Sequence, residues 1–252
     1  MDLDVDRGGE LGIVERMKPA SRLPATAGTR RRPPVRPVPQ WQLKITLEYT
    51  DPAVWRRLAV RGDTRLDMLH AVLQIAMGWT NSHLHMFLIG ADRYSDPTFA
   101  DDLDWGEEDM DERKVSLSEV IASGVNTFGY EYDFGDSWTH LVVVEKELPG
   151  DANSRGIARC LEGARACPPE DCGGAHGFTE LMQVFKKPGH RQYRSMVEWL
   201  GGRFDPLAFD VEETNKFLSM LKGRRTSEYG LGSILEARFL ASEAKRKRAH
   251  DA

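Results

Sequence analysis

Three histidines and two aspartates lie in two short segments, and their side chains are of the kinds that bind metal ions or exchange protons. His83 and His85 are two residues apart, so on a strand both would point to the same face. Asp133, Asp136 and His140 surround a predicted hairpin tip. Two imidazoles and a carboxylate can hold a catalytic metal, so this cluster predicts a metal-dependent hydrolase or nuclease. The alternative, in which these side chains only satisfy turns and the core edge, is favoured because no ligand-spaced helix motif such as His-x-x-x-His is present.

A second candidate is the loop that holds every cysteine of the chain. Its three thiols and one imidazole, within seventeen residues, are Cys160, Cys167, Cys172 and His176. Together they could supply the four ligands of a structural zinc ion, the one cofactor that the sequence suggests. The spacings Cys-x6-Cys and Cys-x4-Cys differ from the Cys-x2-Cys knuckles of familiar zinc folds, so free cysteines in a rigid acidic loop are the favoured alternative.

Composition and charge limit the class of protein. The chain has 252 residues, of which 40% are apolar and 29% charged, which is ample for one buried core. With no long apolar run for a membrane span or signal peptide, we expect a soluble, cytoplasmic protein without a membrane partner. The net charge of −5 conceals an acidic body, about −10 over residues 41–242. Nucleic acid is therefore expected to bind only through the basic tails, at Arg30–Arg36 and Lys245–Arg248, and solvated ends are the favoured alternative.

The elements that must position these residues follow from periodicity. Alternating apolar residues predict strands over 41–49, 54–60, 84–89, 127–134 and 138–148. Capping-box spacing at Thr64-Arg65-Leu66-Asp67 and Ser116-Leu117-Ser118-Glu119 predicts two helices that end at Gly78 and Gly124. Further helices are expected over 178–186, 192–200, 211–221 and 233–247, and residues 149–174 are expected to be irregular.

This order of elements predicts an α+β protein, an antiparallel-sheet α/β roll with helices packed at one face and a helical C-terminal part. A proline- and arginine-rich leader over 1–40 is expected to be disordered. One domain is expected over 41–222, followed by a basic helix or tail over 223–252. The acidic run between Asp96 and Glu112 lacks the spacing of an EF-hand and predicts a solvated loop.

Several motifs, in order, resemble the plasmid pRiA4b open-reading-frame-three-like family and the TnpR-type passenger proteins of insertion elements. The motifs include Met77-Gly78-Trp79, His83-Leu84-His85-Met86-Phe87, Tyr130–His140, Cys160–Gly163, Cys167–Gly174 and Phe204-Asp205-Pro206. The resemblance covers about residues 41–220 and implies an α+β roll. It implies a mobile-element context but no established activity, and no recombinase activity is expected, since no serine-recombinase pattern is present. Because the sequence shows no assembled catalytic signature beside its cysteine loop, the leading hypothesis is an uncharacterised, non-catalytic accessory or binding protein, with structural zinc in that loop as a further expectation. The resemblance also implies that polar turn residues of these motifs form a shared site, which adds Glu170 and Asp171 as binding candidates.

Overall fold

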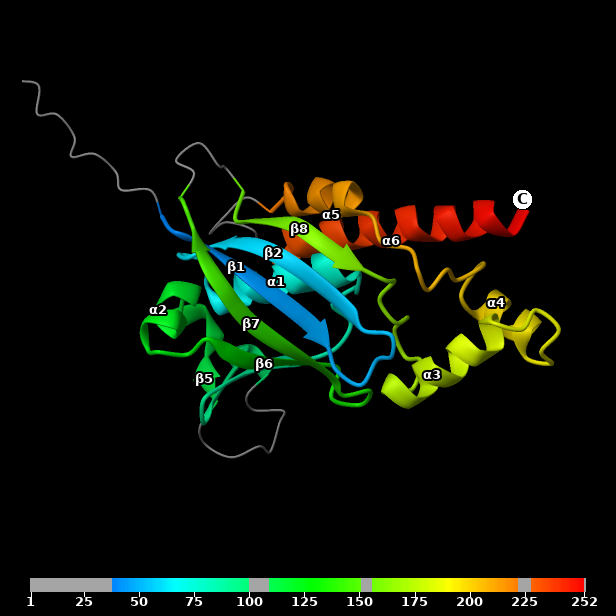
Figure 1. Cartoon of the computed structure of the whole chain (residues 1–252), viewed down its shortest axis with the longest axis horizontal. Helices are drawn as coiled ribbons and strands as arrows, with labels where there is room; N and C mark the ends of the chain where they lie inside the picture. Colours follow the sequence, from blue (N-terminus) through cyan, green and yellow to red (C-terminus); the bar gives the residue numbers. More distant parts are fainter. Residues whose placement is uncertain (1–37, 100–108, 151–155, 222–227, 252) are drawn as a thin grey trace, which may run out of the picture. The chain divides into compact units, whose positions relative to one another are not determined.

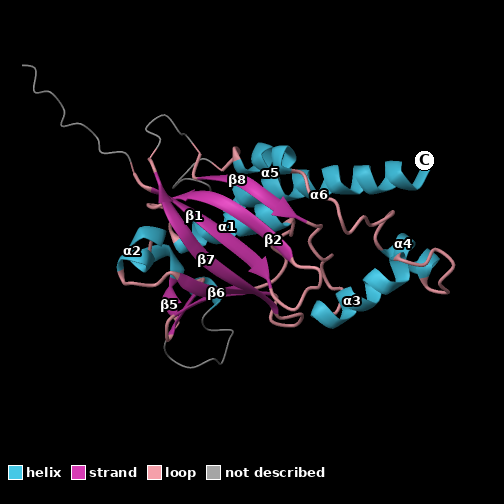
Figure 2. Cartoon of the chain, viewed as in Figure 1, coloured by secondary structure: helices cyan, strands magenta, loops and turns pink. Residues whose placement is uncertain are grey.

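The computed structural model describes residues 38–99, 109–150, 156–221 and 228–251. Within these ranges the chain forms an eight-stranded sheet with six α-helices (Figures 1 and 2). In the same ranges, no helix combines the length and the apolar character needed to cross a membrane. The predicted α+β class is confirmed.

The sheet has the strand order β5-β4-β3-β6-β7-β1-β2-β8. Its strands are β1 (Gln40–Leu47), β2 (Val54–Arg61), β3 (His85–Ile89), β4 (Asp92–Ser95), β5 (Met110–Asp111), β6 (Thr127–Tyr132), β7 (Trp138–Leu148) and β8 (Ala158–Ala164). Neighbouring strands are antiparallel except β4 and β5, which are parallel. The helices are α1 (Leu66–Met77), α2 (Leu117–Ala122), α3 (Gly174–Phe185), α4 (Tyr193–Trp199), α5 (Val211–Leu218) and α6 (Glu228–Asp251).

The core lies between the sheet and α1, which runs behind β1 and β2 in Figure 1. Alternation in β1 directs Leu43, Ile45 and Leu47 into this layer, as the period of two predicts. Almost every residue of α1 is buried, including the polar His70 and Gln74. A helix this deeply buried needs partners for its polar side chains, and those partners lie beneath the candidate site.

The two predicted capping boxes have different outcomes. Ser116 and Glu119 form the reciprocal bonds of a capping box at α2, as predicted. The capping box predicted at Thr64 is wrong: Arg65 is the N-cap of α1 without a side-chain cap, and the buried Thr64 hydroxyl has no hydrogen-bond partner. The chain entering α1 pairs through its backbone with the chain entering α2, since Leu117 N donates to Thr64 O at 2.8 Å.

The prediction of an irregular segment over 149–174 is also wrong, because β8 lies within it. β8 pairs with β2, and α5 covers its outer edge. There the Asn215 carboxamide accepts from Cys160 N at 2.8 Å and donates to Cys160 O at 2.9 Å, as a neighbouring strand would. These partners are distant in the sequence, so local periodicity could not reveal the strand.

Residues 1–37 of the predicted leader lie outside the described residues, and β1 begins at Gln40. At the other end, Ile234 and Leu235 of α6 belong to the same core cluster as α1. The divisions at residues 40 and 222 stay predictions.

Candidate metal centre

Two loops carry the candidate site, and the buried guanidinium of Arg56 links the ends of the helix and the strand from which these loops start. One loop follows α1 and the other follows β8. Arg56 donates from Nε to Ala76 O at 2.8 Å, and from Nη2 to Met77 O at 3.4 Å, at the end of α1. It also donates to Ala164 O at 2.9 Å and Arg165 O at 3.0 Å, at the end of β8. Burial lowers the pKa of Arg56 to about 10, so the side chain stays charged at neutral pH.

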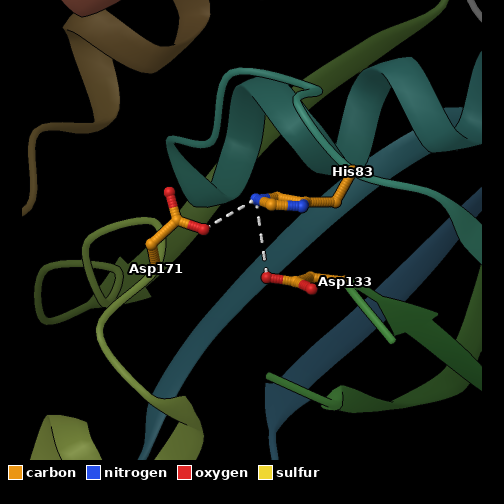
Figure 3. A group of neighbouring side chains, drawn as sticks. All are labelled: His83, Asp133 and Asp171. Carbon is orange, nitrogen blue, oxygen red and sulfur yellow. Dashed lines mark ion pairs between the residues drawn. The ribbon is translucent and has the colours of Figure 1, made fainter. Parts of the chain in front are cut away.

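The loop after α1 places the imidazole of His83 among carboxylates. Its Nε2 lies 3.2 Å from Oδ1 of Asp171, 3.6 Å from Oδ2 of Asp133 and 4.0 Å from Oε2 of Glu170. Figure 3 shows the first two carboxylates directed at the imidazole from separate loops. The Nε2 atom is buried, yet none of these contacts has the geometry of a hydrogen bond.

Asp133 is fixed by the turn between β6 and β7. Its backbone is left-handed, with φ 59°, and its Oδ1 accepts from the amides of Gly135 at 3.0 Å and Asp136 at 3.3 Å. These bonds leave Oδ2 directed toward His83. Asp136 has another role, since its Oδ2 accepts from Gly173 N at 3.1 Å and joins this turn to the loop after β8.

Glu170 and Asp171 approach His83 from the loop after β8. Oε1 of Glu170 accepts from the amide of Thr80 at 2.8 Å and from the Tyr132 hydroxyl at 3.1 Å. Burial is the main cause that raises the pKa of Tyr132, so its hydroxyl stays protonated and donates. These hydrogen bonds therefore fix the Glu170 carboxylate. The Asp171 side chain, in contrast, is 73% exposed and forms the solvent-facing side of the cluster.

The arrangement fits a divalent cation. Among the described residues, one group of metal-ligating side chains has its ligand atoms within 4.8 Å of one another, and it consists of His83, Asp133 and Asp171. Two atoms bound to one ion at ~2.1 Å lie about 3.0–3.4 Å apart at ordinary coordination angles, close to the 3.2 and 3.6 Å found from His83 Nε2. One imidazole with carboxylates suits zinc, manganese or ferrous iron, and three protein ligands leave a position open.

Asp171 also lines an open groove of about 320 Å³ along α3 and α4. The lining of the groove is mixed: Leu181, Val184, Met196 and Trp199 are its large apolar side chains, and Glu180 adds a second carboxylate. The candidate metal centre and the groove therefore share a residue.

His85 and His140 lie away from this cluster, so the predicted five-residue set is not brought together. β3 begins only at His85, which places His83 in the preceding loop and removes the expected common face. His85 contacts Oε2 of Glu112 through Nε2 at 2.8 Å. His140 is fully buried, and its Nδ1 lies 3.0 Å from Tyr130 O. Desolvation lowers the pKa of both histidines to about 4, as expected for neutral core imidazoles.

The four predicted zinc ligands are spread over different surroundings. Cys160 is buried on β8 with its thiol directed to Glu162 O, Cys172 lines the groove, and the largely exposed His176 lies 3.9 Å from Glu180. In the described chain, they do not form a group of three with converging ligand atoms. Burial raises the pKa of all three thiols, to about 12 for Cys172, so they stay protonated at neutral pH when no metal is bound. Zinc at this loop stays a prediction without geometric support.

A buried polar network beneath the site was missed by the sequence analysis. His70 bonds the Tyr130 hydroxyl through Nδ1 at 2.8 Å and Asn81 Oδ1 through Nε2 at 2.7 Å. The amide of Asn81 donates to Gln74 Oε1 at 2.9 Å, so two residues of α1 hold the loop that carries His83. Their spacing of four, in a helix otherwise apolar on this face, was the signal that could have revealed the network.

The His70 ring also stacks on His85, with ring centroids 3.4 Å apart. Glu112, the partner of His85, was expected in a solvated acidic loop, but it is 3% exposed. Burial raises its pKa to about 8. The prediction is wrong for this residue, because the short 3₁₀ turn Glu112–Lys114 packs against α1.

The fold and the site together define an α+β protein with one mixed sheet and a His–carboxylate cluster where two loops meet the β6–β7 turn. Residues 39–213 match the family model described as plasmid pRiA4b ORF-3-like protein, and the chain belongs to this family. It is 39% identical over 186 residues to the uncharacterized protein y4hQ of Sinorhizobium fredii, a match that covers 73% of this chain and 92% of that protein.

A solved structure has a similar fold. The crystal structure of the protein of unknown function MM3350 from Methanosarcina mazei Go1 matches with a TM-score of 0.63 and 32% sequence identity. The match covers 70% of this chain and 97% of that one. The names of both relatives leave their activity open, so the function of this chain has to be argued from its own site.

Proposed function

We propose that this protein is a divalent-metal-dependent hydrolase whose metal is held by His83, Asp133 and Asp171. The observation that carries the proposal is the buried Nε2 of His83, which faces carboxylates yet has no hydrogen-bond partner. A buried polar atom without a partner costs about 1–3 kcal/mol. A cation at this point would satisfy the imidazole lone pair and offset the repulsion between the carboxylates.

The chain's own groups support hydrolysis around such an ion, which would polarise a substrate oxygen and lower the pKa of a bound water. The turn amides fix Asp133, so the site is preorganised. Glu170 is held by Thr80 and Tyr132 with its carboxylate 4.0 Å from His83 Nε2, where it can accept a proton from water. The exposed Asp171 leaves the open coordination side accessible to a substrate.

The acidic body favours a hydrolase of neutral substrates over a nuclease, because a phosphate backbone requires a basic surface. On α6, Lys245 of the predicted basic run already forms an ion pair with Glu213 at 2.8 Å. The other predicted basic segment, Arg30–Arg36, lies outside the described residues. Nucleic-acid binding through the tails is thus the weaker proposal, and it predicts weak binding that is lost at high salt.

Metal titration of the full chain by isothermal calorimetry, with Mn²⁺ and Zn²⁺ separately, tests the proposal. We expect one ion per chain. Asp133→Asn keeps the turn-capping oxygen but loses the charge, and should weaken binding at least about tenfold. Asp136→Asn is the matched control in the same turn, and should bind within a factor of about three of the parent. Equal affinity of both variants would contradict the ligand assignment.

Activity is tested on a panel of chromogenic acyl and phosphate esters, with and without EDTA. Metal-dependent turnover that Asp133→Asn loses and Asp136→Asn keeps is the expected result. If the chain binds metal but turns over no ester on the panel, the hydrolase assignment fails. The non-catalytic accessory role, in the mobile-element context that the TnpR-type resemblance suggests, then becomes the better account.

A further inference from the structure

We infer that the groove along α3 and α4 is a substrate subsite, which binds the apolar tail of an ester or amide whose carbonyl oxygen faces the metal centre. The inference rests on the proposed function and names its substrate class. Two features carry it: Asp171 belongs to both the metal centre and the groove, and four large apolar side chains lie in the lining of the groove.

The groove is held rigidly against the metal centre. Asp136 accepts from the amide of Gly173, immediately before α3, and thereby ties the start of this helix to the turn that carries Asp133. A Cβ on Gly174 would lie 2.6 Å from Asp136 O, and a Cβ on Gly177 would lie 1.9 Å from Cys172 O. Only glycine permits these backbone approaches, so the distance between centre and groove is set by packed backbone.

The lining determines which part of a substrate the groove accepts. Leu181 and Val184 of α3 are buried, and Met196 and Trp199 belong to α4. Trp199 is 50% exposed, which leaves aromatic surface free for a ligand. The volume of about 320 Å³ is at the lower end of the range for small-molecule sites.

The charges around the groove disfavour one class of tail. The carboxylates of Asp171 and Glu180 repel an anionic tail, and the apolar side chains of the lining favour an aliphatic or aromatic group. The other end of the substrate must present an oxygen to the cation, which the carbonyl of an acyl compound does. In the reaction the oxygen of water bonds to the acyl carbon and the bond to the leaving oxygen or nitrogen breaks. The proton of water passes through Glu170 to the leaving group, which yields an acid and an alcohol or amine.

Paired hydroxamate probes test this assignment, because hydroxamates bind metal ions through two oxygens whatever tail they carry. The affinities of acetohydroxamate and benzohydroxamate are measured on the Mn²⁺-loaded full chain. Burial of the phenyl group should make benzohydroxamate at least about tenfold tighter. Trp199→Ala and Met196→Ala should each reduce this preference at least about threefold while leaving the affinity for Mn²⁺ unchanged. Phe239→Ala, which removes an exposed aromatic residue of α6 outside the groove, is the control and should keep the preference.

The outcomes separate the two proposals. If Mn²⁺ does not bind, the metal centre fails. If Mn²⁺ binds but the two hydroxamates bind equally, the groove assignment is overturned and the metal centre stands. A preference for benzohydroxamate that survives in both groove variants would also overturn it, because the phenyl group would then bind elsewhere.

Discussion

Replacement of Arg56 by methionine should destabilise the fold strongly, although methionine fills similar space. The guanidinium is 1% exposed and supplies hydrogen bonds to the carbonyls of Ala76, Ala164 and Arg165 at 2.8–3.0 Å. Methionine leaves these three carbonyls without that donor. Since a buried acceptor without a partner costs about 1–3 kcal/mol, we expect the free energy of unfolding to fall by about 4 kcal/mol.

Part of this loss is offset, because burial of the arginine is itself unfavourable. Desolvation is the largest cause that lowers the pKa of Arg56, so the charge gains less from its surroundings than it loses from water. Arg56→Lys keeps the charge but has fewer hydrogen-bond donors, so its free energy of unfolding should lie between those of the parent and Arg56→Met.

Urea unfolding at pH 7, followed by tryptophan fluorescence, measures these differences. Arg57→Met is the matched control, because the neighbouring side chain lies on the opposite face of β2, 25% exposed, and pairs with Glu145 and Glu162. An exposed ion pair contributes at most about 1 kcal/mol, so Arg57→Met should be nearly neutral. If Arg56→Met lies within about 1 kcal/mol of the parent, the carbonyls do not depend on Arg56 and the clamp between the two loops is refuted.

Three further predictions concern the core and the network beneath the site. His140 has a pKa of about 4 in the fold, below the unfolded value of about 6.5. The unfolded chain therefore takes up a proton first as the pH falls, and His140 alone should lower the stability by about 2 kcal/mol from pH 7 to pH 5, in addition to the contribution of His85, whose pKa is also about 4. His140→Asn should make the dependence of stability on pH shallower by this amount in urea titrations, and an unchanged slope would contradict the prediction. Asn81→Ala, which removes the contact to His70, should weaken Mn²⁺ binding about tenfold in calorimetry, whereas unchanged affinity would assign Asn81 a purely structural role. Gly163→Val would place a Cβ 2.4 Å from the Phe209 ring, so the free energy of unfolding should fall by about 1–3 kcal/mol and the melting temperature should fall with it. Gly189→Ala is the control, because a Cβ at Gly189 has no atom within 4 Å, and its melting temperature should stay close to that of the parent. Equal melting temperatures of the two variants would contradict the prediction.

The sequence revealed the parts of the fold that depend on local pattern. The strands at 41–49 and 138–148 and the capping box at Ser116 follow from alternation and from the reach of one side chain, and all are confirmed. β8 was missed because its partners are β2 and Asn215, both distant in the sequence. When a strand is stabilised mainly by its pairing with distant segments, its own residues show little of the alternating pattern that predicts a strand.

The candidate site shows the same division. His83 and Asp133 were expected to share one metal ion with His85, Asp136 and His140, and Asp171 was added only through the family resemblance, as a binding candidate. Which side chains meet depends on Arg56 and on the close backbone approach of Gly174, the first residue of α3, to Asp136, and these are contacts between distant segments. Pairing His83 with His85 failed for a local reason, because β3 begins two residues after His83.

Anomalous diffraction from crystals soaked in Mn²⁺ tests the metal centre most directly. One anomalous peak should lie within about 2.3 Å of His83 Nε2 and of one carboxylate oxygen each from Asp133 and Asp171. A soak with Zn²⁺ should place its ion at the same point. No peak at saturating metal, or a peak bound by Cys160, Cys167, Cys172 and His176 in its place, would contradict the account.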